Sequence, residues 1–158
     1  MIKILTVGKQ KEKAMRQLTE EYAKRLQAFT KLEMLEVADE NAPQTLHQAQ
    51  MEQVKDKEGA RLLSHIKDTD QVILLDLAGK MLTSEGLAEK IDQLQTYSGG
   101  NIVFVIGGSL GLSQALLQRA DFRWKLSDLT FPHQLVRVLL AEQLYRAFTI
   151  INHQPYHK

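Results

Sequence analysis

The chain has 158 residues, of which 44% are hydrophobic and 25% are charged, and it contains no cysteine. This length predicts a single domain (residues 1–158) that can bury a hydrophobic core without cross-links. The composition excludes disulfides, cysteine-ligated metal sites and a thiolate nucleophile. No apolar run reaches the roughly 18 residues of a membrane-spanning helix, and the amino terminus lacks a signal-peptide pattern, so we expect a cytoplasmic protein with no membrane partner.

The net charge of +1 hides an uneven distribution along the chain. Residues 1–30 carry +4 and residues 119–158 carry +3, whereas residues 31–70 carry −4 and residues 71–118 carry −2. The two basic ends would form one positive face if the fold brought them together. That face would either bind a polyanion or consist of ordinary solvated helix surface.

Apolar stretches and helical patterns alternate along the chain, which predicts an α/β domain with a mostly parallel sheet flanked by helices. Strands are expected at residues 2–7, 32–37, 71–77, 101–106 and, in a short piece, 124–126. Helices are expected at residues 12–29, at 84–97 with Thr83 or Ser84 as the cap, in a short stretch from Ser113, and at 133–151. A further helix is expected after the turn at Asn41-Ala42-Pro43, and its apolar positions are Leu46, Val54, Leu62 and Ile66. The strand at 101–106 is the most apolar, as expected when helices cover both faces.

A glycine loop, Gly107-Gly108-Ser109-Leu110-Gly111, follows this most apolar strand and precedes a helix. Parallel sheets bind ligands at this place, outside the carboxyl ends of their strands. The spacing is not G-x-G-x-x-G, and no G-x-x-x-x-G-K-[ST] occurs, so the fingerprints of dinucleotide and P-loop sites are missing. The glycines indicate either close approach of the backbone to a flat ligand or a tight turn that needs positive φ.

The segment that enters the last helix and the helix itself carry two further signals. Residues 126–133 read either as a binding loop or as an ordinary helix entry with Thr130 as its cap. On the helix, Arg137 falls within the main apolar face and must therefore be paired. Apolar residues also occupy the opposite side, beside Glu142 and Arg146, which predicts either a subunit interface or a central core helix with an i, i+4 ion pair.

The tail after the last helix ends in Pro155-Tyr156-His157-Lys158. His153 and His157 have the spacing of a metal-binding pair on a helix, but Pro155 breaks the helix between them, so we predict no metal site. The tail offers an aromatic ring that stacks on a base, a cation for phosphate and an imidazole that titrates near neutrality. The alternative is a frayed terminus without a function.

A set of short motifs is spread along the chain: Lys57-Glu58-Gly59, Ile106-Gly107-Gly108, Leu126-Ser127, Leu129-Thr130-Phe131-Pro132-His133, Val136-Arg137-Val138, Ala141-Glu142-Gln143, Tyr145-Arg146-Ala147 and Pro155-Tyr156-His157. Together they resemble one known family, the bacterial enzymes that methylate N3 of a pseudouridine in large-subunit ribosomal RNA, within the SPOUT or α/β-knot class. The resemblance covers essentially the whole chain.

This resemblance implies a SPOUT fold with a carboxy-terminal trefoil knot, a homodimer, and S-adenosylmethionine as the cofactor. By position, the cofactor-binding residues would be Leu75, Gly107, Leu126, Ser127, Asp128, Leu129, Thr130 and Phe131. The missing phosphate fingerprints fit, because this cofactor carries no phosphate. The implied partner is large-subunit ribosomal RNA within the ribosome, which a single small domain would recognise by its folded shape.

For the reaction we expect Arg146 to stabilise negative charge on the imide, Tyr156 to position the base, and His157 to assist proton removal or contact phosphate. The absence of cysteine is consistent with methylation at nitrogen, which needs no thiolate nucleophile. Two alternatives stay open. One is a non-catalytic ribosome-binding factor on the same fold, and the other is a small nucleotide-binding hydrolase, which the missing phosphate motifs disfavour.

Overall fold

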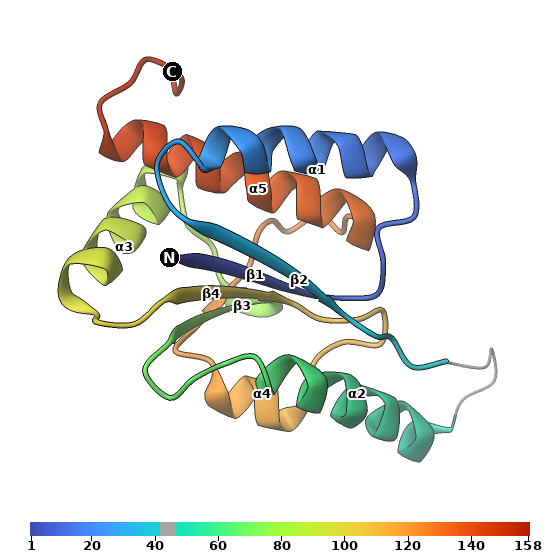
Figure 1. The fold of residues 1–158 in the computed structure, drawn as a ribbon. Helices are drawn as coiled ribbons and strands as arrows, with labels where there is room; N and C mark the ends of the chain where they lie inside the picture. Colours follow the sequence, from blue (N-terminus) through green and yellow to red (C-terminus); the bar gives the residue numbers. More distant parts are fainter. Residues whose placement is uncertain (42–46) are drawn as a thin grey trace.

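The computed structural model describes residues 1–41 and 47–158, which build a five-stranded parallel sheet (Figure 1). The strands are β1 (Ile2–Val7), β2 (Leu32–Val37), β3 (Gln71–Lys80), β4 (Ile102–Ile106) and β5 (Phe122–Trp124), in the spatial order β2-β1-β4-β3-β5. Every adjacent pair runs parallel, so the predicted fold class is confirmed. The edge strand β2 is only partly buried, whereas the inner strand β1 is buried along its whole length.

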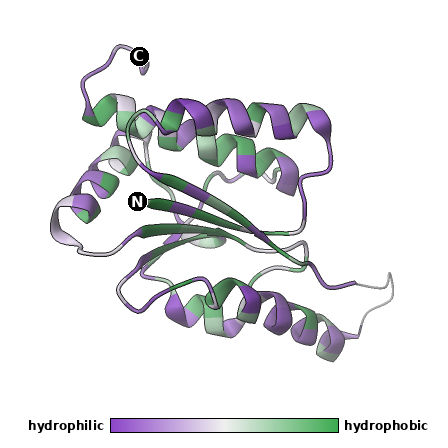
Figure 2. Ribbon diagram, viewed as in Figure 1, coloured by the Kyte–Doolittle hydropathy of each residue, from purple (hydrophilic) through white to green (hydrophobic). Residues whose placement is uncertain are grey.

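Helices cover both faces of the sheet (Figure 1). One face carries α1 (Lys13–Leu26), α3 (Ser84–Tyr97) and α5 (His133–Ile151), and the other carries α2 (Gln48–Leu63) and α4 (Gln114–Arg119). Figure 2 shows nearly continuous hydrophobic strands and helices that turn their hydrophilic sides outward. Of the described helices, none is long and apolar enough to cross a membrane. The predicted positions Ala42, Pro43 and Leu46 lie outside the described residues.

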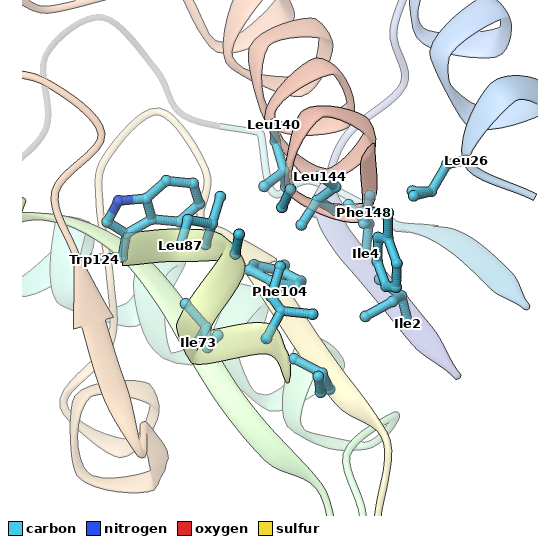
Figure 3. Packing of buried hydrophobic residues seen from close by; sticks show 14 of the residues in the cluster. Ile2, Ile4, Leu26, Ile73, Leu87, Phe104, Trp124, Leu140, Leu144 and Phe148 are labelled. Carbon is cyan, nitrogen blue, oxygen red and sulfur yellow. The ribbon is translucent and has the colours of Figure 1, made fainter. Parts of the chain in front are cut away.

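Two hydrophobic clusters hold the helices to the sheet, because successive strand residues point to opposite faces. On the face of α1, α3 and α5, Ile4 and Phe104 pack with Leu144 and Phe148 of α5 (Figure 3). Trp124 of β5 contacts Phe104 edge to face, with ring centroids 6.3 Å apart. The second cluster lies beneath α2 and α4 and is built from Leu5, Val7, Val37, Leu62, Val72, Leu74, Val103, Val105 and Leu116.

The sheet departs from the predicted boundaries where β3 meets β5. Both Leu75 and Lys80 pair with Trp124, so residues 76–79 bulge out of the ladder. The bulge needs Gly79, because a Cβ there would lie 2.5 Å from the carbonyl oxygen of Arg123. As a result β3 runs three residues beyond its predicted end, and β5 ends at Trp124 instead of beginning there. The trefoil knot implied by the resemblance stays a prediction.

The first and last helices lie side by side (Figure 1). This packing brings residues 1–30 next to the second basic segment, residues 119–158, which is the arrangement that a shared positive face requires. The α1 helix ends at Leu26, three residues before its predicted end, and the chain then turns into β2.

Candidate cofactor and catalytic site

A cavity of about 730 Å³ opens at the carboxyl ends of β3, β4 and β5. This is the edge at which parallel sheets bind ligands, and the volume lies within the usual range for small-molecule sites. The loop of residues 107–111 forms one wall and the segment of residues 126–133 forms another. Apolar side chains dominate the lining, among them Leu75, Ile106 and Trp124.

Seven of the eight residues predicted to bind the cofactor line this one cavity, namely Leu75, Gly107, Leu126, Ser127, Leu129, Thr130 and Phe131. The eighth, Asp128, is not among the lining residues. Its side chain is 73% exposed and forms an ion pair with Lys125. Within the segment, the Ser127 hydroxyl accepts a hydrogen bond from the Leu129 amide at 3.0 Å, so it shapes the loop. Thr130 does not cap α5, because the N-cap residue is Pro132.

The three glycines of the loop are required for two different reasons. Gly111 has φ +105°, which other residues rarely adopt, and its amide donates to the Gly108 carbonyl at 3.1 Å, so the turn interpretation holds for this residue. Gly107 and Gly108 lie outside the left-handed region and are needed for close packing. A Cβ on Gly107 would lie 2.6 Å from Cδ2 of Leu112, and one on Gly108 would overlap the Glu58 carboxylate.

The charged groups at the cavity wall are already paired, which bears on the kind of ligand that fits. Lys55 forms an ion pair with Glu52 at 2.7 Å, and Arg123 forms one with Asp76 at 2.5 Å. Partial burial, together with the nearby positive charge of Arg137, lowers the pKa of His133 at the mouth. The two cations of the lining are thus already neutralised, which disfavours a ligand that carries phosphate groups.

Arg137 is buried in the apolar face of α5 and is paired, as its position predicted. Its guanidinium binds Glu36 of β2 at 2.6 Å and donates to the carbonyls of Val7 and Gly8 at 2.7 and 2.8 Å. These partners all belong to the same chain. The burial of Arg137 is therefore explained within one subunit and gives no support for a dimer.

The three residues predicted to be catalytic form a second cluster at the far end of α5, centred on Glu142. The carboxylate Oε1 of Glu142 accepts hydrogen bonds from Arg146 Nε at 2.9 Å, from Arg146 Nη2 at 2.5 Å and from the Tyr156 hydroxyl at 3.2 Å. The Arg146 guanidinium also lies over the Tyr156 ring, 4.8 Å from its centroid. Burial and the Glu142 charge raise the pKa of Tyr156, which keeps its hydroxyl protonated.

The hydrogen bonds of His157 indicate which tautomer a neutral ring adopts. Arg146 Nη1 lies 3.1 Å from Nδ1 of His157, and because arginine only donates, Nδ1 must be the acceptor. The proton of a neutral ring is then on Nε2, which lies 2.7 Å from Glu85 of α3. The Glu85 backbone and the His157 contact both lower the pKa of Glu85. His157 thus links the tail to α3, and Arg146 occupies its Nδ1 acceptor.

In one chain the cavity and the Glu142 cluster are far apart. Val136 lines the cavity, and Arg146 lies ten residues farther along the same helix. At 1.5 Å per residue this is a separation of about 15 Å along the helix axis. Sequence reasoning recognised Glu142 as an i, i+4 partner of Arg146 and named Glu58 only as part of a family motif. It missed Glu85 and Lys55, whose relevance depends on which helices pack together.

Comparison with known proteins identifies relatives over nearly the whole length. A family model described as "Predicted SPOUT methyltransferase" matches residues 1–157. Proteins named "Ribosomal RNA large subunit methyltransferase H" from Bacillus pumilus (strain SAFR-032), Listeria monocytogenes serotype 4b (strain CLIP80459) and Limosilactobacillus fermentum (strain NBRC 3956 / LMG 18251) are each 54% identical to this chain over 157 residues, covering 99% of both sequences.

A solved structure described as "a probable methylase family protein from Haemophilus influenzae Rd KW20" superposes with a TM-score of 0.52 at 14% identity. It covers 96% of this chain, which spans 66% of that structure, and it supports the fold alone. The match of the family model to residues 1–157, together with the 54% identity of these relatives, confirms the resemblance inferred from the motifs: the chain belongs to the SPOUT methyltransferase family.

Proposed function

We propose that this protein methylates N3 of a pseudouridine in large-subunit ribosomal RNA, with S-adenosylmethionine as the methyl donor. The observation that carries the proposal is the cavity at the carboxyl ends of β3, β4 and β5, which is lined by seven of the eight residues that the family resemblance implied for cofactor binding. The relatives named as large-subunit ribosomal RNA methyltransferases support the substrate class.

The lining of the cavity fits this cofactor. The apolar side chains of Leu75, Leu126 and Phe131 would contact the adenine, and the backbone of the 107–111 loop would approach the ribose and the methionine moiety closely. When bound, S-adenosylmethionine supplies an electrophilic methyl group. The protein's own task is then to orient the base, exclude water and receive one proton.

We propose further that the active form is a homodimer in which the cavity of one subunit receives the tail of the other. The support is the separation of about 15 Å within one chain, because reacting groups must approach to about 3–3.5 Å. Apolar side chains stand free at the cavity rim: Leu77 and Leu129 are 67% and 68% exposed. A second copy would cover them together with the half-buried Leu135 and Leu139 of α5.

The Glu142 cluster suggests how the tail would act on the base. The Tyr156 ring would stack on or position the base, since the raised pKa keeps its hydroxyl neutral. Arg146 would turn its guanidinium toward the imide oxygen as negative charge develops there. That movement would free Nδ1 of His157 to accept the N3 proton, and the protonated ring could then donate to a phosphate.

The competing proposal is a non-catalytic ribosome-binding factor on the same fold. The two proposals differ in whether the cavity binds cofactor, so isothermal titration calorimetry with S-adenosylmethionine separates them. Transfer of a labelled methyl group to ribosomes, with free ribosomal RNA as the comparison, then tests the substrate. Cofactor affinity with transfer to ribosomes supports the enzyme, whereas absence of heat at high micromolar cofactor favours the binding factor.

A further inference from the structure

A buried carboxylate lies beneath the glycine loop and has no role in the function proposed above. Glu58 belongs to α2, is only 5% exposed, and is not among the residues that line the cavity. Its Oε2 accepts a hydrogen bond from the Glu40 amide at 3.1 Å, beyond the end of β2. Its Oε1 has no hydrogen-bond partner among the described residues and lies against Gly108.

The contact between Glu58 and the loop is close enough to dictate the residue at position 108. Gly108 has no left-handed φ, so its backbone conformation permits alanine, but a Cβ there would overlap the Glu58 carboxylate. The neighbouring Gly59 makes a similar approach, because a Cβ on it would lie 2.9 Å from Cβ of Ser113, the N-cap residue of α4. The α2 helix therefore packs closely against both ends of the segment 108–113.

A buried carboxylate oxygen without a partner destabilises the fold, and an apolar side chain would fill the same space at lower free energy. Burial raises the pKa of Glu58, and the neighbouring Asp39 and Glu40 carboxylates raise it further, whereas the Glu40 amide and Arg61 lower it. The presence of a destabilising carboxylate at this position is most simply explained by its contact with the 107–111 loop above it.

We propose that Glu58 is a positioning residue, whose carboxyl group, anchored by the Glu40 amide, supports Gly108 and thereby sets the shape of the 107–111 loop that contacts the cofactor. This inference rests on the proposed function, because it assigns Glu58 to the same cofactor site. It also gives a reason for glycine at position 108 that is independent of the ligand.

A double-mutant cycle on cofactor affinity tests the proposal. In the full-length protein, Gly108→Ala should raise the Kd for S-adenosylmethionine about tenfold, because the methyl group displaces the Glu58 carboxyl. In Glu58→Ala the supporting contact is lost and the Kd should rise about fivefold. In the double variant the methyl group occupies the vacated space, so Gly108→Ala should then change the Kd by less than about twofold.

Two further variants make the outcome decisive. Gly99→Ala is the matched control, since a Cβ there has no atom within 4 Å, and its Kd should equal that of the wild type. Glu58→Gln keeps the shape and the acceptor for the Glu40 amide, so its Kd should stay within about twofold of the wild-type Kd. This comparison with the wild type tests the proposal even if Glu58→Ala does not fold. Circular dichroism and the urea midpoint establish that each variant is folded.

Equal fold-changes for Gly108→Ala in both backgrounds would overturn the proposal, as would a Glu58→Gln variant that is folded but binds as weakly as Glu58→Ala. In either case wild-type cofactor binding is intact and only the role of Glu58 fails. If the wild type itself does not bind S-adenosylmethionine, the proposed function fails instead, and the two failures are thereby distinguished.

Discussion

The proposed pairing of one subunit's cavity with the other's tail predicts that two inactive variants restore activity when mixed. Gly107→Val should inactivate the cavity. A Cβ on residue 107 would lie only 2.6 Å from Cδ2 of Leu112, so the valine side chain would displace Leu112, which itself lines the cavity. Removal of residues 155–158 inactivates the tail and leaves the core untouched, because these residues follow α5. Each homodimer should therefore be folded and nearly inactive in methyl transfer.

The size of the restored activity follows from counting intact sites. After equal amounts of the two variants exchange subunits at random, about half of the dimers are mixed. In a mixed dimer one site combines the intact cavity with the intact tail, and the other combines both defects. About a quarter of the wild-type activity should therefore return, measured as labelled methyl transferred to ribosomes, with native mass spectrometry to quantify mixed dimers. Confirmed mixed dimers without restored activity would place cavity and tail of the same chain in one site and refute the reasoning.

Three further predictions concern single side chains. Arg137→Met should lower the free energy of unfolding in urea by about 2–4 kcal/mol, since the carbonyls of Val7 and Gly8 lose their donor. Glu36→Gln should cost only about 1 kcal/mol, because the Glu36 side chain is half-exposed and glutamine still accepts a hydrogen bond from Arg137; equal losses would contradict this ranking. Because the pKa of Glu58 is raised above 4.5, the folded state binds its proton more tightly, so as the pH rises from 4 to 7 Glu58→Gln should gain stability relative to the wild type. If Glu58→Gln gains no stability relative to the wild type between pH 4 and 7, or loses stability, burial does not destabilise the Glu58 carboxylate. Tyr156→Ala should slow single-turnover methyl transfer more than Tyr156→Phe, which keeps the ring and loses only the hydrogen bond to Glu142; equal rates would exclude stacking.

Local patterns were sufficient to predict the strands and helices, because burial follows sequence periodicity closely in a sheet covered on both faces. The fully apolar run at 102–106 became the buried β4, and Thr83 and Ser113 cap α3 and α4 through their hydroxyl oxygens. The boundaries at β3 and β5 were wrong because the bulge at residues 76–79 depends on a pairing between distant strands. No local pattern records such a register shift.

The candidate site likewise has features that local sequence patterns predict and contacts that they do not predict. The glycine loop could be located because it follows a strand that periodicity identifies, and Arg137 could be recognised as paired because its helix face is apolar. Its partner Glu36 lies 101 residues earlier in the chain and could not be deduced from spacing. Glu58 could be named only as part of a family motif, because its contact with Gly108 depends on the packing of α2 under the loop.

The packing of α1 against α5 has a consequence for the synthesis of the protein. Arg137 binds the carbonyls of Val7 and Gly8, which lie 130 and 129 residues earlier in the chain, so the first strand receives this contact only when α5 has been made. Before then the α1 face of β1 lacks its cover, and the nascent chain exposes apolar surface that chaperones recognise. Completion of the fold therefore waits until translation is nearly finished, and an aborted chain without α5 would leave this face covered only by α1 and α3, with apolar surface open to aggregation and proteolysis.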